Sequence, residues 1–347
     1  MKAPNGRPTL KDVSVATGFS TYTVSRALAD LPGVSEKTRL FVREAAADVG
    51  YVPNRLAQTL KQKSSSAIGF LTANNSNPFY SALVNAFEEV VIPQGFHCIV
   101  SDATDHGHYS EERESRFLEN LLEQRVAGVA LTYQPISAQM RRLSDWGLPV
   151  VFVDSNAPAD HPEIPAVFAD GEDVSFAVGM HFFEHGYMDW LFVGHPTTWP
   201  TRITREKGIR RAARATGARL TVIEGHNDID DAQAAVERYL GSVATPPRAI
   251  FVGNEPLLTG AMRALRKARL RVPADVALIG YDAFAWAELL TPAITLVDQG
   301  IETMGRLAGN RMLYEINRAN GVEAGGTPSM GLPPSRLIIR ESCGCSK

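Results

Sequence analysis

The chain has 347 residues, of which 44% are hydrophobic, 21% are charged and 8% are aromatic, and its formal net charge is −3. This composition is typical of a globular protein of two or three domains, and it excludes a disordered chain. It contains no apolar run of the length that spans a bilayer, and the N-terminus lacks the apolar core of a secretory signal. We therefore expect a cytoplasmic protein.

The charge is unevenly distributed. Residues 1–63 carry ten basic and five acidic side chains, a net charge of +5, and the remainder of the chain carries −8. A basic head on an acidic body predicts a module that binds a polyanion, joined to a domain with another task. A chance fluctuation of surface charge would give the same sums, so the helix pattern has to decide.

The first 50 residues are expected to form three helices, each preceded by a capping residue. Thr9 caps the first helix with Asp12 as capping-box partner, Ser20 caps a second over residues 21–29, and Ser35 caps a third. The residues of the third helix expected to face the core are Leu40, Val42, Ala46 and Val49. Two short helices about a tight turn, followed by a third, form a helix-turn-helix unit. The second helix fits the major groove of DNA, where an arginine fork matches guanine. A small bundle that binds a protein is the alternative. The exposed side chains of the second helix are Thr21, Tyr22, Ser25 and Arg26.

A short basic segment follows the three helices. Pro53 permits a helix start, and Leu56 and Leu60 share one face over only two turns. A helix this short is marginal alone, which favours a hinge that folds on DNA with an apolar wedge in the minor groove. A plain linker ending in serines is the alternative.

From residue 67 onward, short apolar runs alternate with amphipathic helical stretches, for example those at residues 80–94, 109–124 and 255–270. This alternation predicts parallel sheets covered by helices. Because about 280 residues are more than a single hydrophobic core usually contains, we expect two α/β subdomains. Ligands bind at the carboxyl ends of such strands, where polar residues follow three of the runs. The predicted strands are residues 67–72, 98–101, 126–132, 150–154, 190–194, 220–224, 249–253 and 276–281, and the polar residues are Asp154, Asn254 and Asp282.

The N-terminal residues carry the pattern T-L-x-D-V-x-x-x-x-G-x-S-x-x-T-V-S-R-x-L, followed by G-Y-x-P-N-x-x-A. This pattern strongly resembles the head and hinge of the LacI/GalR family of bacterial transcription regulators, and the resemblance extends to Arg340–Cys343. It implies an all-α helix-turn-helix head at residues 1–52, a hinge helix and linker at 53–66, and an effector-binding and dimerisation body at 67–347. The implied body resembles a periplasmic sugar-binding protein, with an N-subdomain of about 67–165 and 295–325 and a C-subdomain of about 166–294 and 326–347.

The resemblance also implies roles in DNA binding. Ala29 departs from the family pattern, in which several members carry an asparagine, and this departure reduces the expected backbone contacts. The implied base-reading residues are Thr21, Tyr22 and Arg26; the backbone-contacting residues are Thr9, Ser20, Ser25, Ser35, Thr38 and Asn54; and the minor-groove residues of the hinge are Ala57 and Leu60.

For the effector, the resemblance implies an arginine clamp at Arg205 with Asp282 as its carboxylate partner. A bidentate guanidinium and a carboxylate together satisfy vicinal hydroxyl groups, and aromatic rings stack on an apolar sugar face. Trp199, Thr201, Asp170 and Trp286 are weaker candidates, placed by their proximity in the sequence to the residues that match the family, and Glu255 stands where family members often have an aspartate. Together with the residues at strand ends, the candidate effector-binding residues are Phe79, Tyr80, Asp154, Asp170, Arg205, Asn254, Asp282 and Gln299.

The expected protein is a homodimeric repressor that binds a pseudo-palindromic operator and responds to a sugar or sugar derivative. A purine-type effector, a sugar-binding transport component and an enzyme on the same scaffold are the alternatives. We expect no cofactor and no metal. The pair His181/His185 lacks the H-E-x-x-H form, and Cys343 and Cys345 have no second cysteine pair to complete a zinc site.

Overall fold

The computed structural model describes residues 8–52, 65–105, 108–322, 326 and 335–345. The chain divides into two compact units, Met1–Ser64 and Ser65–Lys347, which we call the head and the body. The expected hinge helix falls almost wholly outside the described residues. Within the described ranges, no helix is both long enough and apolar enough to cross a membrane.

The described part of the head is helical, with α1 (Leu10–Thr17), α2 (Thr21–Leu28) and α3 (Glu36–Asp48) as the capping pattern predicts. The Asp12 carboxylate accepts a 2.7 Å hydrogen bond from the Thr9 backbone N–H. The Ser20 and Ser35 hydroxyls accept bonds from the backbone N–H of the third residue of α2 and of α3. The buried side chains of the head's core are Val13, Val24, Ala27, Val42 and Ala46.

Leu40 was expected to face this core, and that prediction is wrong. Its side chain is 52% exposed, whereas Val42 and Ala46 are buried. Leu40 lies two residues before Val42, and two residues turn an α-helix by about 200°, to the opposite face.

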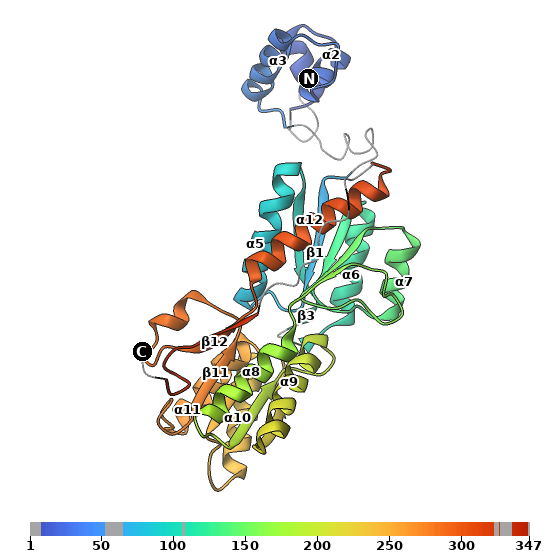
Figure 1. The fold of residues 1–347 in the computed structure, drawn as a ribbon. Helices are drawn as coiled ribbons and strands as arrows, with labels where there is room; N and C mark the ends of the chain where they lie inside the picture. Colours follow the sequence, from blue (N-terminus) through green and yellow to red (C-terminus); the bar gives the residue numbers. More distant parts are fainter. Residues whose placement is uncertain (1–7, 53–64, 106–107, 323–325, 327–334, 346–347) are drawn as a thin grey trace. The chain divides into compact units, whose positions relative to one another are not determined.

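The first lobe of the body is a parallel sheet covered by helices (Figure 1). The strand order is β2-β1-β5-β6-β7, and every residue of β1, β5 and β6 is buried, which explains the continuous apolar runs. Helices α5 and α12 pack side by side against this sheet. The elements are β1 Ala67–Thr72, α5 Pro78–Val91, η1 Ile92–Gln94, β2 His97–Asp102, β3 Thr104–Asp105, β4 His108–Tyr109, α6 Glu111–Glu123, β5 Gly128–Leu131, α7 Ser137–Asp145, β6 Val150–Val153, β7 Ala166–Val167 and α12 Ile301–Ala319.

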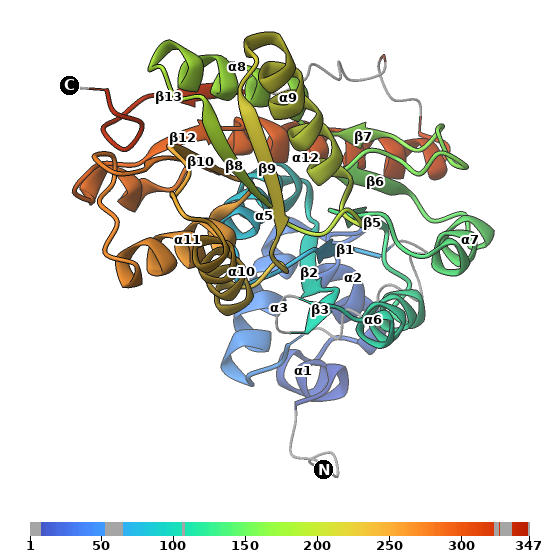
Figure 2. The same ribbon diagram turned by 90° about the horizontal axis from the view of Figure 1, so that it is seen from below.

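The second lobe has a sheet of order β13-β12-β11-β10-β8-β9, parallel except for β13. Helices α8 and α9 cover one face and α10 and α11 the other, as the two apolar clusters of this lobe and the view in Figure 2 show. The elements are α8 Gly171–Glu184, β8 Asp189–Gly194, α9 Pro200–Thr216, β9 Arg219–Glu224, α10 Ile229–Ser242, β10 Ala249–Val252, α11 Glu255–Lys267, β11 Ala277–Tyr281, η2 Ala285–Leu289, β12 Thr295–Asp298 and β13 Arg336–Ile338.

The chain crosses between the lobes at positions slightly different from those expected. Strand β7 pairs with β6 in the first lobe, and β12 pairs with β11 in the second. The crossings therefore fall at residues 168–170 and 299–300 rather than at 165 and 294. Short strands such as β7 carry too few residues to show a period, so the sequence does not reveal which sheet they join.

Close packing of α8 on α9 depends on Gly208. A Cβ atom at this position would lie 2.1 Å from the backbone oxygen of Glu172. We expect Gly208→Ala to lower the free energy of unfolding by about 2 kcal/mol, because the two helices would have to move apart. Urea denaturation of the full chain measures this.

The matched control is Gly241→Ala in α10, where a Cβ would meet no heavy atom within 4 Å. Alanine there should be neutral or stabilise by about 0.5 kcal/mol, because it restricts the unfolded chain. Equal destabilisation by both substitutions would contradict the packing argument.

Candidate functional site

The head presents α2 as its candidate DNA-reading helix. Thr21 and Tyr22 are exposed at its first turn, the Tyr22 side chain by 69%. Arg26 lies one turn later and donates a 3.1 Å hydrogen bond to the Tyr22 hydroxyl and another to the backbone oxygen of Pro32. Its guanidinium lies 5.5 Å from the centre of the Tyr22 ring. The three predicted base readers therefore lie on one stretch of α2, with Arg26 held against its neighbours.

Most predicted backbone contacts lie at helix N-termini, where free backbone N–H groups favour phosphate oxygens. Thr9, Ser20 and Ser35 cap the three helices, and the Thr38 hydroxyl lies 2.8 Å from that of Ser35. Ser25 is half-buried on α2. Asn54, Ala57 and Leu60 lie outside the described residues.

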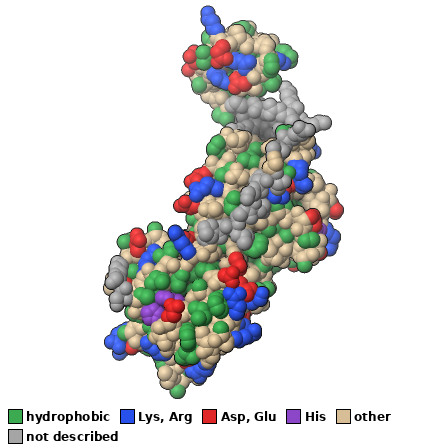
Figure 3. All heavy atoms as spheres, in the orientation of Figure 1, with side chains coloured by type: hydrophobic (Ala, Val, Ile, Leu, Met, Phe, Trp, Pro, Cys, Tyr) green, Lys and Arg blue, Asp and Glu red, His purple; other side chains and the backbone are tan. Residues whose placement is uncertain are grey.

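Basic and acidic side chains are interspersed on the face of the head seen in Figure 3. Asp30 forms ion pairs with Arg39, at 3.0 Å, and with Arg43. Arg39 also donates to the backbone oxygen of Leu31. These two arginines therefore fix the loop between α2 and α3.

In the body, a small cavity with about 20 Å³ of free volume lies between the two lobes. This volume holds about one water molecule, so the lobes must move apart to admit a larger polar ligand. The first lobe contributes polar groups that follow β5 and β6, and the second contributes groups that follow β8, β10 and β11, so the carboxyl ends of parallel strands form its walls. The lining residues are Ala73, Asn77, Phe79, Tyr80, Thr132, Asp154, His195, Trp199, Pro200, Thr201, Arg205, Asn227, Asn254 and Asp282.

Arg205 is the centre of a buried polar chain. It donates hydrogen bonds to the backbone oxygen of Gly253 and, at 3.2 Å, to Oε1 of Gln299. Gln299 in turn donates a 2.6 Å bond to Asp282. The guanidinium also lies 3.8 Å from the centre of the Tyr281 ring. Gln299 thus joins the predicted clamp to its carboxylate partner and fixes both side chains before a ligand arrives.

Two buried carboxylates face this cavity. Asp154 and Asp282 follow β6 and β11 with φ of +55° and +71°, a left-handed conformation that aspartate tolerates better than most residues. Burial raises the pKa of Asp154 to about 7, against the opposing effect of Arg205. Burial also raises the pKa of Asp282. Arg205 therefore does not fully compensate the negative charge of the two carboxyl groups, and both groups can form hydrogen bonds.

His195 adds a neutral donor and acceptor. Burial, together with Arg205 and Arg202, lowers the pKa of its imidazole well below the usual value. Its Nε2 lies 3.2 Å from the Thr201 hydroxyl. Its Nδ1 is buried and has no hydrogen-bond partner among the described residues. A buried polar atom without a partner is costly, and a bound hydroxyl group would satisfy it.

Six of the eight predicted effector residues line the cavity. Gln299 does not line it but supports two residues that do. Asp170 is exposed at the crossing into α8, where its carboxylate accepts a 2.8 Å bond from the Glu172 backbone N–H. It caps that helix and is not brought into the cavity, and neither is the weaker candidate Trp286.

Several residues that line the cavity were not predicted from the sequence. His195 and Thr132 each follow a parallel strand directly, as Asp154 does, so the strand-end rule applied to β5 and β8 finds both. Asn227 lies in the loop after β9, and its side chain accepts a 2.7 Å bond from Asn254. The sequence contains no signal for that contact.

The raised pKa of Asp154 predicts a pH-dependent stability. An aspartate titrates near 3.9 in an unfolded chain, so between about pH 4 and pH 7 the folded state holds the extra proton. The free energy of unfolding therefore falls as the pH rises through this window, and this loss of stability is complete above pH 7. In Asp154→Asn we expect the difference in stability between pH 5 and pH 8 to shrink by about 2 kcal/mol, as measured by urea denaturation. A variant with the wild-type pH dependence would show that another group is responsible.

Two family models match the chain. The model described as "Bacterial regulatory proteins, lacI family" matches residues 9–54, and "Periplasmic binding protein-like domain" matches residues 180–343. The ribose operon repressor of Escherichia coli (strain K12) is 30% identical over 319 residues, which cover 89% of this chain and 93% of the repressor.

Solved structures are similar over the whole chain. The Lac repressor dimer bound to operator and the anti-inducer ONPF matches with a TM-score of 0.80 and 26% identity, covering 97% of this chain and 99% of that one. The complex of the transcriptional regulator CelR with cellobiose matches with a TM-score of 0.68 and 26% identity, covering 97% and 100%.

Proposed function

The chain belongs to the LacI family of bacterial regulatory proteins, and from that premise we propose that a neutral sugar, bound between the two lobes, controls its affinity for operator DNA. As a family member it is a non-enzymatic DNA-binding repressor with an effector-binding domain. A repressor that binds an operator works in the cytoplasm, as the sequence predicts.

The observation that carries the choice of ligand is the balance of charge in the cavity. Two buried carboxyl groups, Asp154 and Asp282, face one guanidinium, that of Arg205, and the buried His195 is neutral. An anionic ligand would be repelled by two carboxyl groups in a medium of low dielectric constant. Its contacts in the cavity would not compensate the free-energy cost of its desolvation. A neutral polyol can donate hydroxyl protons to the carboxylates and accept bonds from the guanidinium.

The apolar part of the lining supports a ring-shaped ligand. Phe79 and Tyr80 lie edge to face with ring centres 5.1 Å apart, and Trp199 lies on the same cavity. Aromatic faces stack on the C–H face of a sugar ring. The ribose operon repressor and the CelR–cellobiose complex are sugar-related by name, but the repressor PurR of Vibrio atlanticus (strain LGP32) is also similar, so the names alone do not separate a sugar from the purine-type alternative.

Coupling to DNA would act through the angle between the lobes. Asn74 of the first lobe donates a 2.9 Å bond to the backbone oxygen of Asn227 in the second, and His108 lies 3.1 Å from Asp231 across the same gap. A ligand that favours one lobe angle would change how two heads of a homodimer approach a pseudo-palindromic operator. A coupling free energy of about 1–3 kcal/mol is enough for a useful switch.

A thermal-shift screen of the full chain tests the ligand class. Neutral pentoses, hexoses and disaccharides should raise the melting temperature, whereas the corresponding sugar acids and sugar phosphates should not. A ligand at 100 times its Kd stabilises by about 2.7 kcal/mol, which such a screen detects. Stabilisation only by nucleobases would replace the sugar with a purine-type effector.

Binding to DNA selected from a random pool completes the test. Affinity should fall steeply with salt concentration, because each phosphate contact releases condensed counterions. Titration of the stabilising sugar into this complex measures the sign of the coupling. No preference over random DNA would contradict a role as an operator-binding repressor.

A further inference from the structure

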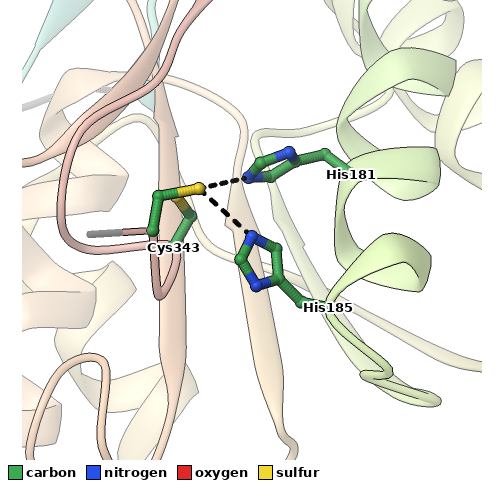
Figure 4. Close-up of side chains that lie close together, drawn as sticks. His181, His185 and Cys343 are labelled. Atoms are coloured by element: carbon green, nitrogen blue, oxygen red, sulfur yellow. Dashed lines mark hydrogen bonds between the residues drawn. The ribbon is translucent and has the colours of Figure 1, made fainter. Parts of the chain in front are cut away.

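Four potential metal ligands meet in the second lobe, and none of them lines the cavity. Two come from the C-terminal end of α8 and two from the segment that follows β13, more than 150 residues later. We call them the C-terminal cluster. Its members are His181, His185, Cys343 and Cys345. Figure 4 shows His181, His185 and Cys343.

The separations in this cluster are close to those of a metal-coordination sphere. Cys345 Sγ lies 3.2 Å from His185 Nε2 and 3.8 Å from His181 Nε2. With metal bonds of about 2.3 Å to sulfur and 2.0–2.1 Å to nitrogen, a tetrahedral zinc ion needs sulfur–nitrogen separations of about 3.6 Å. All four ligand atoms lie within 4.8 Å of one another, so the most distant pair has to close by about 1.5 Å at most.

The backbone between the two cysteines is shaped for this arrangement. Gly344 has φ of +101°, and a Cβ atom there would lie 2.4 Å from the Tyr187 hydroxyl. That hydroxyl donates a 3.3 Å bond to the Cys343 backbone oxygen, and the Tyr187 ring stacks on the ring of His185. Only glycine fits this turn, and Tyr187 positions one ligand from each side of the cluster.

The segment is also fixed to the sheet. The Ser342 hydroxyl donates a 2.6 Å bond to the backbone oxygen of Leu278 and accepts a 2.8 Å bond from the Thr295 backbone N–H. Cys343 beside it is fully buried, and His181 is 8% exposed. The ligands are thus held in place by contacts that need no metal, as in a preorganised site.

We propose that the C-terminal cluster binds one Zn²⁺ ion, which fastens the C-terminal segment to α8. Two thiolates and two imidazoles are a common structural zinc set, and soft sulfur ligands disfavour Mg²⁺ and Ca²⁺. Binding releases the two thiol protons to solvent, so a dipositive ion with two thiolates and two neutral imidazoles carries no net charge. That neutrality suits a buried position. Four protein ligands complete the tetrahedron, which makes the site structural.

The test uses the full chain, purified under reducing conditions without a polyhistidine tag. Elemental analysis should find about one zinc per chain, and Cys343→Ser and His181→Ala should each lose it. After chelation, added Co²⁺ should give the visible bands of a tetrahedral site and the near-ultraviolet band of thiolate ligation. The chelated protein should also melt at a lower temperature, restored by one equivalent of Zn²⁺.

Matched controls separate this site from other cysteines and histidines. Cys98→Ala removes the remaining cysteine, and His108→Ala alters an exposed group of His108, His226 and Asp231; both should retain the zinc. Wild-type protein that holds no zinc and gives no cobalt–thiolate band would overturn the proposal. So would zinc that persists in the cluster variants or is lost in His108→Ala. The cobalt spectrum uses the wild-type chain, so a folding defect in a variant does not affect that measurement.

Discussion

Replacing Arg205 with alanine is expected to abolish stabilisation by the effector and to weaken effector binding by about 100-fold or more. Arg205 is 3% exposed and its guanidinium is held by the Gly253 backbone oxygen and Gln299, so its donors are fixed at the cavity. Truncating one partner of a buried, hydrogen-bonded charged group costs about 2–5 kcal/mol of binding. Isothermal titration with the sugar found in the screen measures the loss.

The control for Arg205 lies on the same helix. Arg202 is 2% exposed, but it pairs with Glu206 and does not line the cavity. Arg202→Ala should therefore lower the melting temperature of the free protein while retaining the shift caused by the sugar. An unchanged sugar affinity in Arg205→Ala, or an equal loss in Arg202→Ala, would show that this arginine does not clamp the effector.

Local signals in the sequence predict the head and the strands well. The capping residues Thr9, Ser20 and Ser35 precede the three helices as expected, and the predicted strand at residues 67–72 matches β1 at both ends. These features depend on hydrogen bonds and apolar periods within about ten residues. The error at Leu40 arose because a short helix with apolar residues on more than one face does not show which face is turned inward.

The cavity could be predicted only in part. Asp154, Asn254 and Asp282 were predicted by their positions at strand ends, and Arg205 by the family resemblance. Asp170 was placed by its proximity to these landmarks in the sequence, but its carboxylate caps α8 instead. Side chains that approach from loops depend on how two lobes close, and a single sequence carries no local pattern for that closure.

The C-terminal cluster shows the same limit more clearly. The His181/His185 pair and the Cys343/Cys345 pair are each visible in the sequence, and each alone is an incomplete ligand set. The prediction of no metal site treated them separately. Only the packing of α8 beside the last strands brings the two pairs together, which is a contact across more than 150 residues.

At the head, Arg26→Ala is expected to remove the preference for one base pair in each half of the operator. A bidentate contact between arginine and guanine discriminates against other bases by about 1–3 kcal/mol. Each of the two heads on one operator would lose this contact. Arg26 is held by Tyr22 and the Pro32 backbone oxygen in the structure, so it must exchange the Pro32 contact for a base. Selection from a random DNA pool, before and after substitution, measures the change position by position.

Lys61 supplies the contrast, because it follows Leu60 within the expected hinge and linker and has no predicted base contact. Lys61→Ala should weaken binding to all sequences alike and should reduce the dependence of affinity on salt by about one phosphate contact. Arg26→Ala should instead lower affinity for the selected operator and leave binding to random DNA almost unchanged. If the selected sequences remain the same without Arg26, the base must be read by Thr21 or Tyr22, and the Arg26 contacts with Tyr22 and Pro32 would then serve only to hold the loop after α2.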